Sequence, residues 1–240
     1  MKLVPSITTT EGSDWKNKLK EVKDLKIEEV AFFPTCLSKE QRNNFYELLK
    51  QSSIKRIPFV HLRNDMDVSE IDFLVKNYGT KIFNTHSERE YSIDKEWLTN
   101  YREIICIENT PNSPFDEKEI KNYGGICLDF AHLEDARLLN LKVYENEISV
   151  LSKFPIKCNH ISVIKKDFSS IEKKGKLHYH SHHMDNLSEL DYLRNYPIQY
   201  FSDFCAIELD NNVSEQLETI KHINNLMVER DKFISKMLEY

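Results

Sequence analysis

Short apolar runs alternate along the chain with segments whose apolar residues recur at helical spacing. The first kind predicts buried β-strands and the second predicts amphipathic helices. The strands are expected at residues 2–7, 28–34, 54–62, 81–86, 103–109, 125–130, 157–164 and 204–210. The helices are expected at residues 14–25, 38–50, 67–79, 116–124, 134–152 and 213–237. Eight strands in regular alternation with helices predict an α/β fold, a (β/α)8 TIM barrel that residues 1–240 form as a single domain.

Some element ends can be predicted from single residues. Ser38, followed three positions later by Gln41, marks the start of a helix, and Gly79 is expected to end the next one as its C-cap. Residues 87–100 show little helical pattern, and residues 165–176 predict a charged loop at the barrel mouth. The chain contains no GxGxxG or Walker-type sequence, which argues against the open-sheet nucleotide-binding folds.

Composition narrows the class of protein. With 40% hydrophobic and 30% charged residues the chain has the profile of an ordinary globular protein, and no window is long and apolar enough for a membrane span. The N-terminus does not have the pattern of a signal peptide, so a cytoplasmic location is expected. A net charge of -6 does not favour a nucleic-acid partner, although it leaves room for a local basic patch. The five cysteines form no CxxC pair and are interpreted as buried free thiols.

Metal-binding side chains follow the apolar runs in sequence order. Five runs end on or beside such residues, and a sixth contains one: His61, His86, Glu108, Asp129, Glu208 and His160. Because the C-terminal ends of parallel barrel strands meet at one mouth, these side chains are expected to converge there. Carboxylates combined with imidazoles suit Zn²⁺, Mn²⁺, Mg²⁺ or Co²⁺. The pattern therefore predicts an enzyme with a metal centre.

The ligand candidates divide into a core and an outer set. The core consists of the residues that end four successive strands: Glu108, Asp129, His160 and Glu208. His61 and His86 lie on the adjacent side of the ring and favour a second metal position. His132 follows Asp129 by three residues and could be a ligand, a substrate contact or part of a second site. Taken alone, a histidine in the position of His61 or His86 is more often a packed structural residue than a ligand, and His132 is equally compatible with a capping or core histidine.

The segment HYHSHH, residues 178–183, contains four of the nine histidines. In an extended segment its period of two would place His178, His180 and His182 on one face, where they could complete a third metal site. The alternative is an exposed polar loop. His222, inside the last helix, is interpreted as structural.

These motifs together resemble a known superfamily. The pieces IENT around Glu108, GICLDFAH around Asp129 and NHIS around His160, with IEL at the last strand, are similar to the xylose isomerase-like superfamily of TIM barrels, and their order is closest to endonuclease IV. The resemblance implies one to three divalent ions per chain. It places an Asp-x-His pair of the family on His180 and His182, so that His180 occupies the aspartate position.

Two enzymatic activities are compatible with this set of ligand candidates. In a hydrolase of phosphoesters, Glu108 would bridge two ions, with the other core residues on one side and His61 and His86 on the other. Glu108, Glu208 and His132 are then the candidate catalytic residues. The candidate substrate-binding residues are Lys165, Lys166 and His183. This interpretation uses every ligand candidate and is the one preferred from the sequence.

In the alternative, a sugar or sugar-phosphate isomerase or epimerase, one ion on the core would polarise a carbonyl, and Glu108 and Glu208 would move a proton on the neighbouring carbon. His132 and Lys166 would orient hydroxyl groups. The outer histidines then have no required role. A barrel that binds metal or ligand without turnover is a third interpretation.

Overall fold

The computed structural model describes the backbone of residues 1–10, 13–169 and 178–237. A parallel sheet forms in the order β1-β11-β8-β7-β6-β5-β4-β3-β2. Its strands are β1 (Leu3–Val4), β2 (Ser6–Thr8), β3 (Ala31–Phe33), β4 (Phe59–His61), β5 (Ile82–Thr85), β6 (Ile105–Glu108), β7 (Gly125–Asp129), β8 (Ile156–Ile161) and β11 (Cys205–Ile207). Pro5 lacks an N–H and separates β1 from β2, which are two halves of one strand. Since β1 pairs with β11 and β2 with β3, this strand closes the sheet into an eight-stranded TIM barrel.

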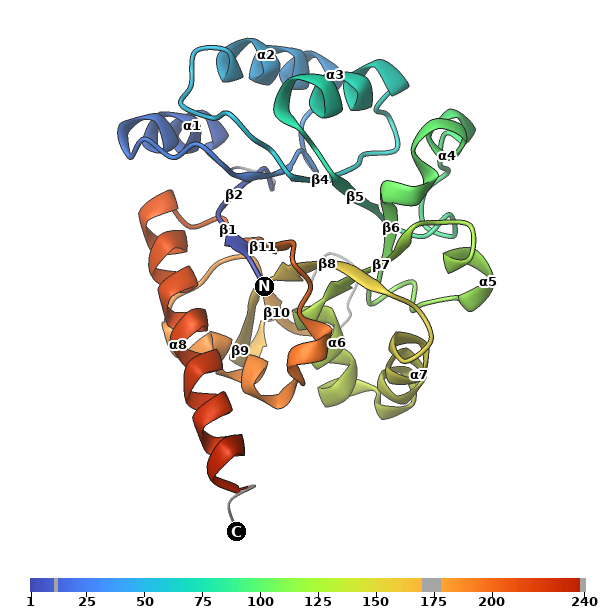
Figure 1. Cartoon of the computed structure of the whole chain (residues 1–240), viewed down its shortest axis with the longest axis vertical. Coiled ribbons are helices and arrows are strands. Elements are labelled where there is room, and N and C mark those ends of the chain that lie inside the picture. Colours follow the sequence, from blue (N-terminus) through green and yellow to red (C-terminus); the bar gives the residue numbers. More distant parts are fainter. Residues whose placement is uncertain (11–12, 170–177, 238–240) are drawn as a thin grey trace.

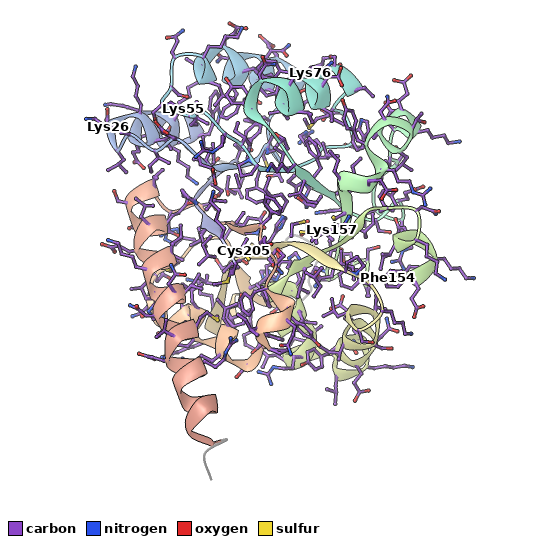
Figure 2. All side chains as sticks on the ribbon, in the orientation of Figure 1. Lys26, Lys55, Lys76, Phe154, Lys157 and Cys205 are labelled. Carbon is purple, nitrogen blue, oxygen red and sulfur yellow. The ribbon has the colours of Figure 1, made fainter. Side chains whose placement is uncertain are left out.

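Helices surround the ring of strands, as Figure 1 shows. They are α1 (Trp15–Asp24), α2 (Lys39–Leu49), α3 (Val68–Tyr78), α4 (Lys95–Tyr101), α5 (Glu117–Ile120), α6 (Phe130–Leu139), α7 (Leu141–Leu151) and α8 (Val213–Met237). Short 3₁₀ helices are η1 (Arg102–Ile104), η2 (Leu187–Asn195) and η3 (Ile198–Tyr200). In Figure 2 the side chain of Lys26 extends at the outer edge of the molecule, whereas Cys205 lies near its centre.

The caps follow local sequence. Ser38 and Gln41 form a capping box at the start of α2, and Gly79 ends α3 with φ 63°, a left-handed conformation that favours glycine. Both predictions are confirmed. Asp129 caps α6 by accepting a hydrogen bond from the backbone N–H of His132, so one residue both ends β7 and starts the following helix.

Two cores stabilise the barrel. The larger fills the space between strands and helices and includes Phe32, Phe45 and Leu74. The smaller lies inside the barrel and consists of Val4, Ala31, Phe33, Phe59, Ile82, Cys106, Cys127, Cys158 and Ala206. The four strand cysteines are buried free thiols as expected, but Cys36 is exposed.

Three predicted segments were wrong in detail. Residues 87–100 were expected to be poor in helix, yet α4 begins within them because Asp94 caps it and Trp97 buries its ring. The single helix expected at 134–152 is two helices, α6 and α7, and Asn140 caps the second.

The third difference concerns the segment after β8. The expected strand 157–164 breaks at Ser162, and β9 (Val163–Ser169) continues away from the barrel into part of the expected loop 165–176. It pairs antiparallel with β10 (His178–Ser181), which confirms that HYHSHH begins as an extended segment. The remainder of the predicted loop, residues 170–177, lies outside the described residues. Among the described helices none has the length and apolar character needed to span a bilayer.

Candidate metal centre

Side chains alternate between the two faces of each strand, and this alternation positions the residues of the candidate metal centre. Cys106, Cys127 and Cys158 point into the barrel, so the side chains two residues later in β6, β7 and β8 point inward as well, one layer closer to the C-terminal mouth. These side chains are Glu108, Asp129 and His160. Strand register brings Asp129 directly opposite His160, and all three residues are at least 98% buried.

Glu108 lies between two groups of histidines. Its Oε2 atom is 3.2 Å from Nε2 of His61 and 3.9 Å from Nε2 of His86. Its Oε1 atom is 3.4 Å from Nδ1 of His160 and 3.9 Å from Nδ1 of His132. The carboxylate is held by Asn84, whose Nδ2 donates a 2.5 Å hydrogen bond to Oε2. One carboxylate therefore faces two separate sets of possible ligands.

The second set gathers around His160. Its Nδ1 is 3.0 Å from Oε2 of Glu208 and 3.9 Å from Oδ2 of Asp129. Neither ring nitrogen of His160, nor Oδ2 of Asp129, makes a hydrogen bond of good geometry with the described residues. Buried polar atoms without partners are costly, and a cation among them would satisfy these atoms together.

Two of the outer histidines, His61 and His132, are oriented by hydrogen bonds that their Nδ1 atoms donate. Nδ1 of His61 donates to the carbonyl oxygen of Leu62 at 2.9 Å, and Nδ1 of His132 donates to the carbonyl oxygen of Asn109, also at 2.9 Å. In His61 this hydrogen bond fixes the tautomer and leaves the lone pair on Nε2, the nitrogen that faces Glu108, as is typical of metal-binding histidines. In His132 the hydrogen-bonded Nδ1 is also the nitrogen that faces Glu108 and Asp129. Burial opposes protonation of His132, but Asp129 and Glu108 outweigh it and raise the pKa of His132 to about 9.

The charges of the centre are strongly coupled. Burial opposes ionisation of Glu108, but the neighbouring His160 outweighs it and holds the pKa of Glu108 well below its usual range. Burial likewise opposes protonation of His160, and Glu108 and Glu208 overcome it and raise the pKa of His160 well above its usual range. The pKa of Glu208 falls to about 2, because His160 and His182 outweigh its burial. Positive charge is thus favoured among these carboxylates.

Ligand geometry groups the residues into candidate cation positions. His61, His86 and Glu108 offer one ligand atom each, within 4.8 Å of one another. The same holds for Asp129, His160 and Glu208. Glu108, Asp129 and His132 form a third group that overlaps both. The strand-end residues predicted from the sequence are therefore brought together.

The HYHSHH segment divides instead of forming one site. Nε2 of His182 lies 3.8 Å from Oε2 of Glu208, at the edge of the centre. Nδ1 of His180 forms a close contact with Oδ2 of Asp135, a residue of α6 that sequence reasoning did not select. His180 and His182, which were expected to complete one site together, therefore face different carboxylates.

Of the expected substrate-binding residues, one is paired with carboxylates and two are exposed. Nζ of Lys165 is 2.8 Å from carboxylate oxygens of both Asp185 and Glu189, so its charge is already paired. Lys166 is exposed. His183 is exposed and lies 3.5 Å from Asp185. These positions do not support the expected role of Lys165 in neutralising a phosphate.

A cavity of about 180 Å³ opens beside two of the ligands. It is lined by Thr35, His61, Leu62, Arg63, Asn64, Thr85, His86 and Tyr91. Arg63 supplies the cationic group of this lining, although its Nε donates to Asp65 at 2.9 Å. Neither Arg63 nor Asn84 could be identified from the sequence, apart from their closeness to predicted strand-end histidines.

Comparison with known proteins finds solved structures that are similar to this chain. No protein-family description and no curated protein matches the chain. The probable 3-DHS dehydratase AsbF from Bacillus anthracis is 14% identical, with 92% of this chain and 97% of that chain covered and a TM-score of 0.44. The IolI protein with a bound zinc atom is 16% identical, with 96% and 98% covered and a TM-score of 0.47.

A xylose isomerase-like TIM barrel protein from Mycobacterium smegmatis, in complex with magnesium, is 14% identical, with 90% of this chain and 88% of that chain covered and a TM-score of 0.46. The Mycobacterium smegmatis protein carries in its description the name of the superfamily that this sequence resembles. Because these TM-scores are below 0.5, the similarities are not used to assign the fold. The barrel is assigned from the strand order of this chain. The closer likeness to endonuclease IV stays a prediction.

Proposed function

We propose that the chain is a divalent-metal-dependent hydrolase of phosphoesters that holds two cations bridged by Glu108. The observation that carries this proposal is the orientation of the Glu108 carboxylate. Oε2 faces His61 and His86, while Oε1 faces His160. A single-ion centre would not need histidines on the Oε2 side, whereas a bridging carboxylate needs ligands on both sides.

The chain's residues divide the work of such a reaction. When bound, a pair of cations supplies an activated water molecule and stabilises charge on the attacking and leaving oxygens. Glu208, whose Oε2 lies 3.0 Å from Nδ1 of His160, is the candidate proton acceptor of this reaction. His182, 3.8 Å from Glu208, is placed to orient it. The cavity beside His61 and His86 would hold the organic part of a small substrate.

A single-metal isomerase or epimerase is the second candidate. It is favoured by Lys165, whose pairing with Asp185 and Glu189 leaves less free positive charge for a phosphate than the sequence suggested. In that reaction Glu108 and Glu208, which both face Nδ1 of His160, would transfer a proton between neighbouring carbons.

Metal stoichiometry combined with turnover distinguishes the two. Protein purified without chelator is analysed for bound metal and assayed with bis(p-nitrophenyl) phosphate in the presence of Zn²⁺ or Mn²⁺. The hydrolase proposal expects at least two ions per chain, loss of one ion in His61→Ala, and loss of hydrolysis with it. One ion per chain that His61→Ala retains, together with solvent deuterium exchange into a ketose or aldose, would overturn it in favour of the isomerase.

A further inference from the structure

A second cluster of metal-binding side chains lies outside the ring. It is formed by Asp135 of α6 with His178 and His180 of β10. Each of the three offers one ligand atom, and these atoms lie within 4.8 Å of one another. None of the three belongs to the two ligand groups that Glu108 joins. The cluster therefore requires an explanation of its own.

The strand β10 and the helix α6 create this cluster. His178 and His180 lie together although the pairing of β10 with β9 shifts register between them, since their rings are 4.5 Å apart. Oδ1 of Asp135 accepts hydrogen bonds from the backbone N–H groups of Tyr179, at 2.7 Å, and His180, at 3.2 Å. These bonds fix the carboxylate against the strand and leave its Oδ2 facing the imidazole of His180.

The two imidazoles are arranged for coordination. Nδ1 of His178 hydrogen-bonds to the carbonyl oxygen of His180 at 3.0 Å. The rings of His178 and His180 are 4.5 Å apart and inclined by 33°. Asp135 is 4% exposed, and the side chain of His180 is 12% exposed.

We propose that Asp135, His178 and His180 form an accessory binding site for one divalent transition-metal cation. Two nitrogen ligands and one carboxylate suit Zn²⁺ or Co²⁺ better than Mg²⁺ or Ca²⁺, which prefer oxygen ligands. Three protein ligands leave a coordination position open. The His180 ring lies 4.7 Å from that of His132, so a cation here would add positive charge at the edge of the proposed catalytic ring.

The experiment separates this site from the ring. Metal-free protein is titrated with Co²⁺, and bound metal is measured by absorption spectroscopy and elemental analysis. In Glu108→Gln the ring is impaired, and the accessory site is expected to retain about one ion per chain. Adding His178→Ala or Asp135→Asn to that background is expected to remove this ion. His222→Ala, which changes a histidine of α8 paired with Asp191, is the matched control and should retain it.

Other outcomes have defined meanings. If Glu108→Gln and Glu108→Gln/His178→Ala bind the same amount of Co²⁺, the accessory site is refuted, while the proposed function is untouched. If Glu108→Gln binds as much metal as the unchanged protein, the proposed function fails, and the accessory site is still decided by the two added substitutions. Thermal melts in EDTA check that each variant folds. A Zn²⁺-induced rise in melting temperature that His178→Gln reduces would add support, since a ligand that binds only the folded state stabilises it.

Discussion

Nδ1 of His160 lies 3.4 Å from Oε1 of Glu108, and the other oxygen of the same carboxylate faces His61 at 3.2 Å. Glu108 is therefore shared between two ligand groups that come from opposite sides of the ring. Its burial makes the sharing consequential, because a carboxylate with 2% exposure has little water to stabilise its charge. Positive charge must be supplied by the neighbouring residues or by bound cations.

Replacing this shared carboxylate should remove the bound cations from the ligand groups that Glu108 joins. Glu108→Gln keeps the size of the side chain but removes its charge, so both ligand groups lose the residue that joins them. We expect metal affinity of the ring to fall by more than about 100-fold, the upper range for residues that only support a ligand. Hydrolysis should be lost in parallel.

The measurement is elemental analysis after dialysis against a weak chelator, with Glu145→Gln as control. Glu145 is an exposed glutamate of α7, and its substitution should leave metal content unchanged. Retention of two ring ions by Glu108→Gln would contradict the bridging role.

Asn84 should support metal binding without contacting a cation itself. Its Nδ2 donates to Oε2 of Glu108 at 2.5 Å and orients the carboxylate. Asn84→Ala removes this restraint, and metal affinity is expected to fall by about 10- to 100-fold. Competition with a fluorescent chelator measures the change. Asn77→Ala, at an exposed position of α3, is the control. Equal affinities in the two variants would show that Asn84 has only a packing role.

Much of this centre could be predicted because parallel strands impose a common direction. Glu108, Asp129 and Glu208 follow apolar runs, and the closed barrel brings such ends to one mouth. Asn84 escaped notice since an asparagine inside an apolar run has no distinctive pattern. Asp135 was missed because it lies on a helix, and its contact with His180 depends on how β10 packs against α6. Contacts between elements distant in sequence are set by packing, which periodicity does not reveal.

The fold was predicted better in its order than in its boundaries. Apolar periodicity identified the strands, but β4 is limited to Phe59–His61 although the apolar pattern suggested 54–62. Pro58, which lacks an N–H, directly precedes it. The hairpin of β9 and β10 was not anticipated, because charged side chains on residues 165–176 resembled a loop and the pairing is nonlocal. The sequence pattern reports burial, whereas strand pairing depends on the partner.

A buried ion pair joins α2 and α3 and should make a large contribution to stability. Arg42 is fully buried, and its Nε and Nη2 donate to the two oxygens of Glu70 at 2.8 and 2.9 Å. Arg42→Met leaves Glu70 buried without its partner, so the free energy of unfolding should fall by about 3–5 kcal/mol. The double variant Arg42→Met/Glu70→Met should be less destabilised than the single one.

Urea unfolding measures both, and the exposed pair of Lys39 and Asp67 provides the comparison. Its Nζ–Oδ2 distance is 2.7 Å, yet both side chains are more than 40% exposed. Lys39→Met should therefore cost less than about 1 kcal/mol. An equal loss in Lys39→Met and Arg42→Met would show that burial does not determine the contribution of these pairs.

Lys18 should make stability depend on pH in the alkaline range. Its side chain is 4% exposed, Nζ donates to the carbonyl oxygen of Leu209 at 2.9 Å, and burial lowers its pKa from 10.5 to about 8. Below pH 8 both the folded and unfolded states carry the proton. Between pH 8 and 10.5 the unfolded state binds more protons, so the free energy of unfolding should rise with pH, by up to about 3 kcal/mol.

Lys18→Met lacks this titration, whereas Lys20→Met, at an exposed position of the same helix, retains it. Urea unfolding from pH 7.5 to 10 should show the difference in stability between the unchanged protein and Lys18→Met shifting in favour of the unchanged protein. Parallel pH profiles for these two would refute the lowered pKa of Lys18.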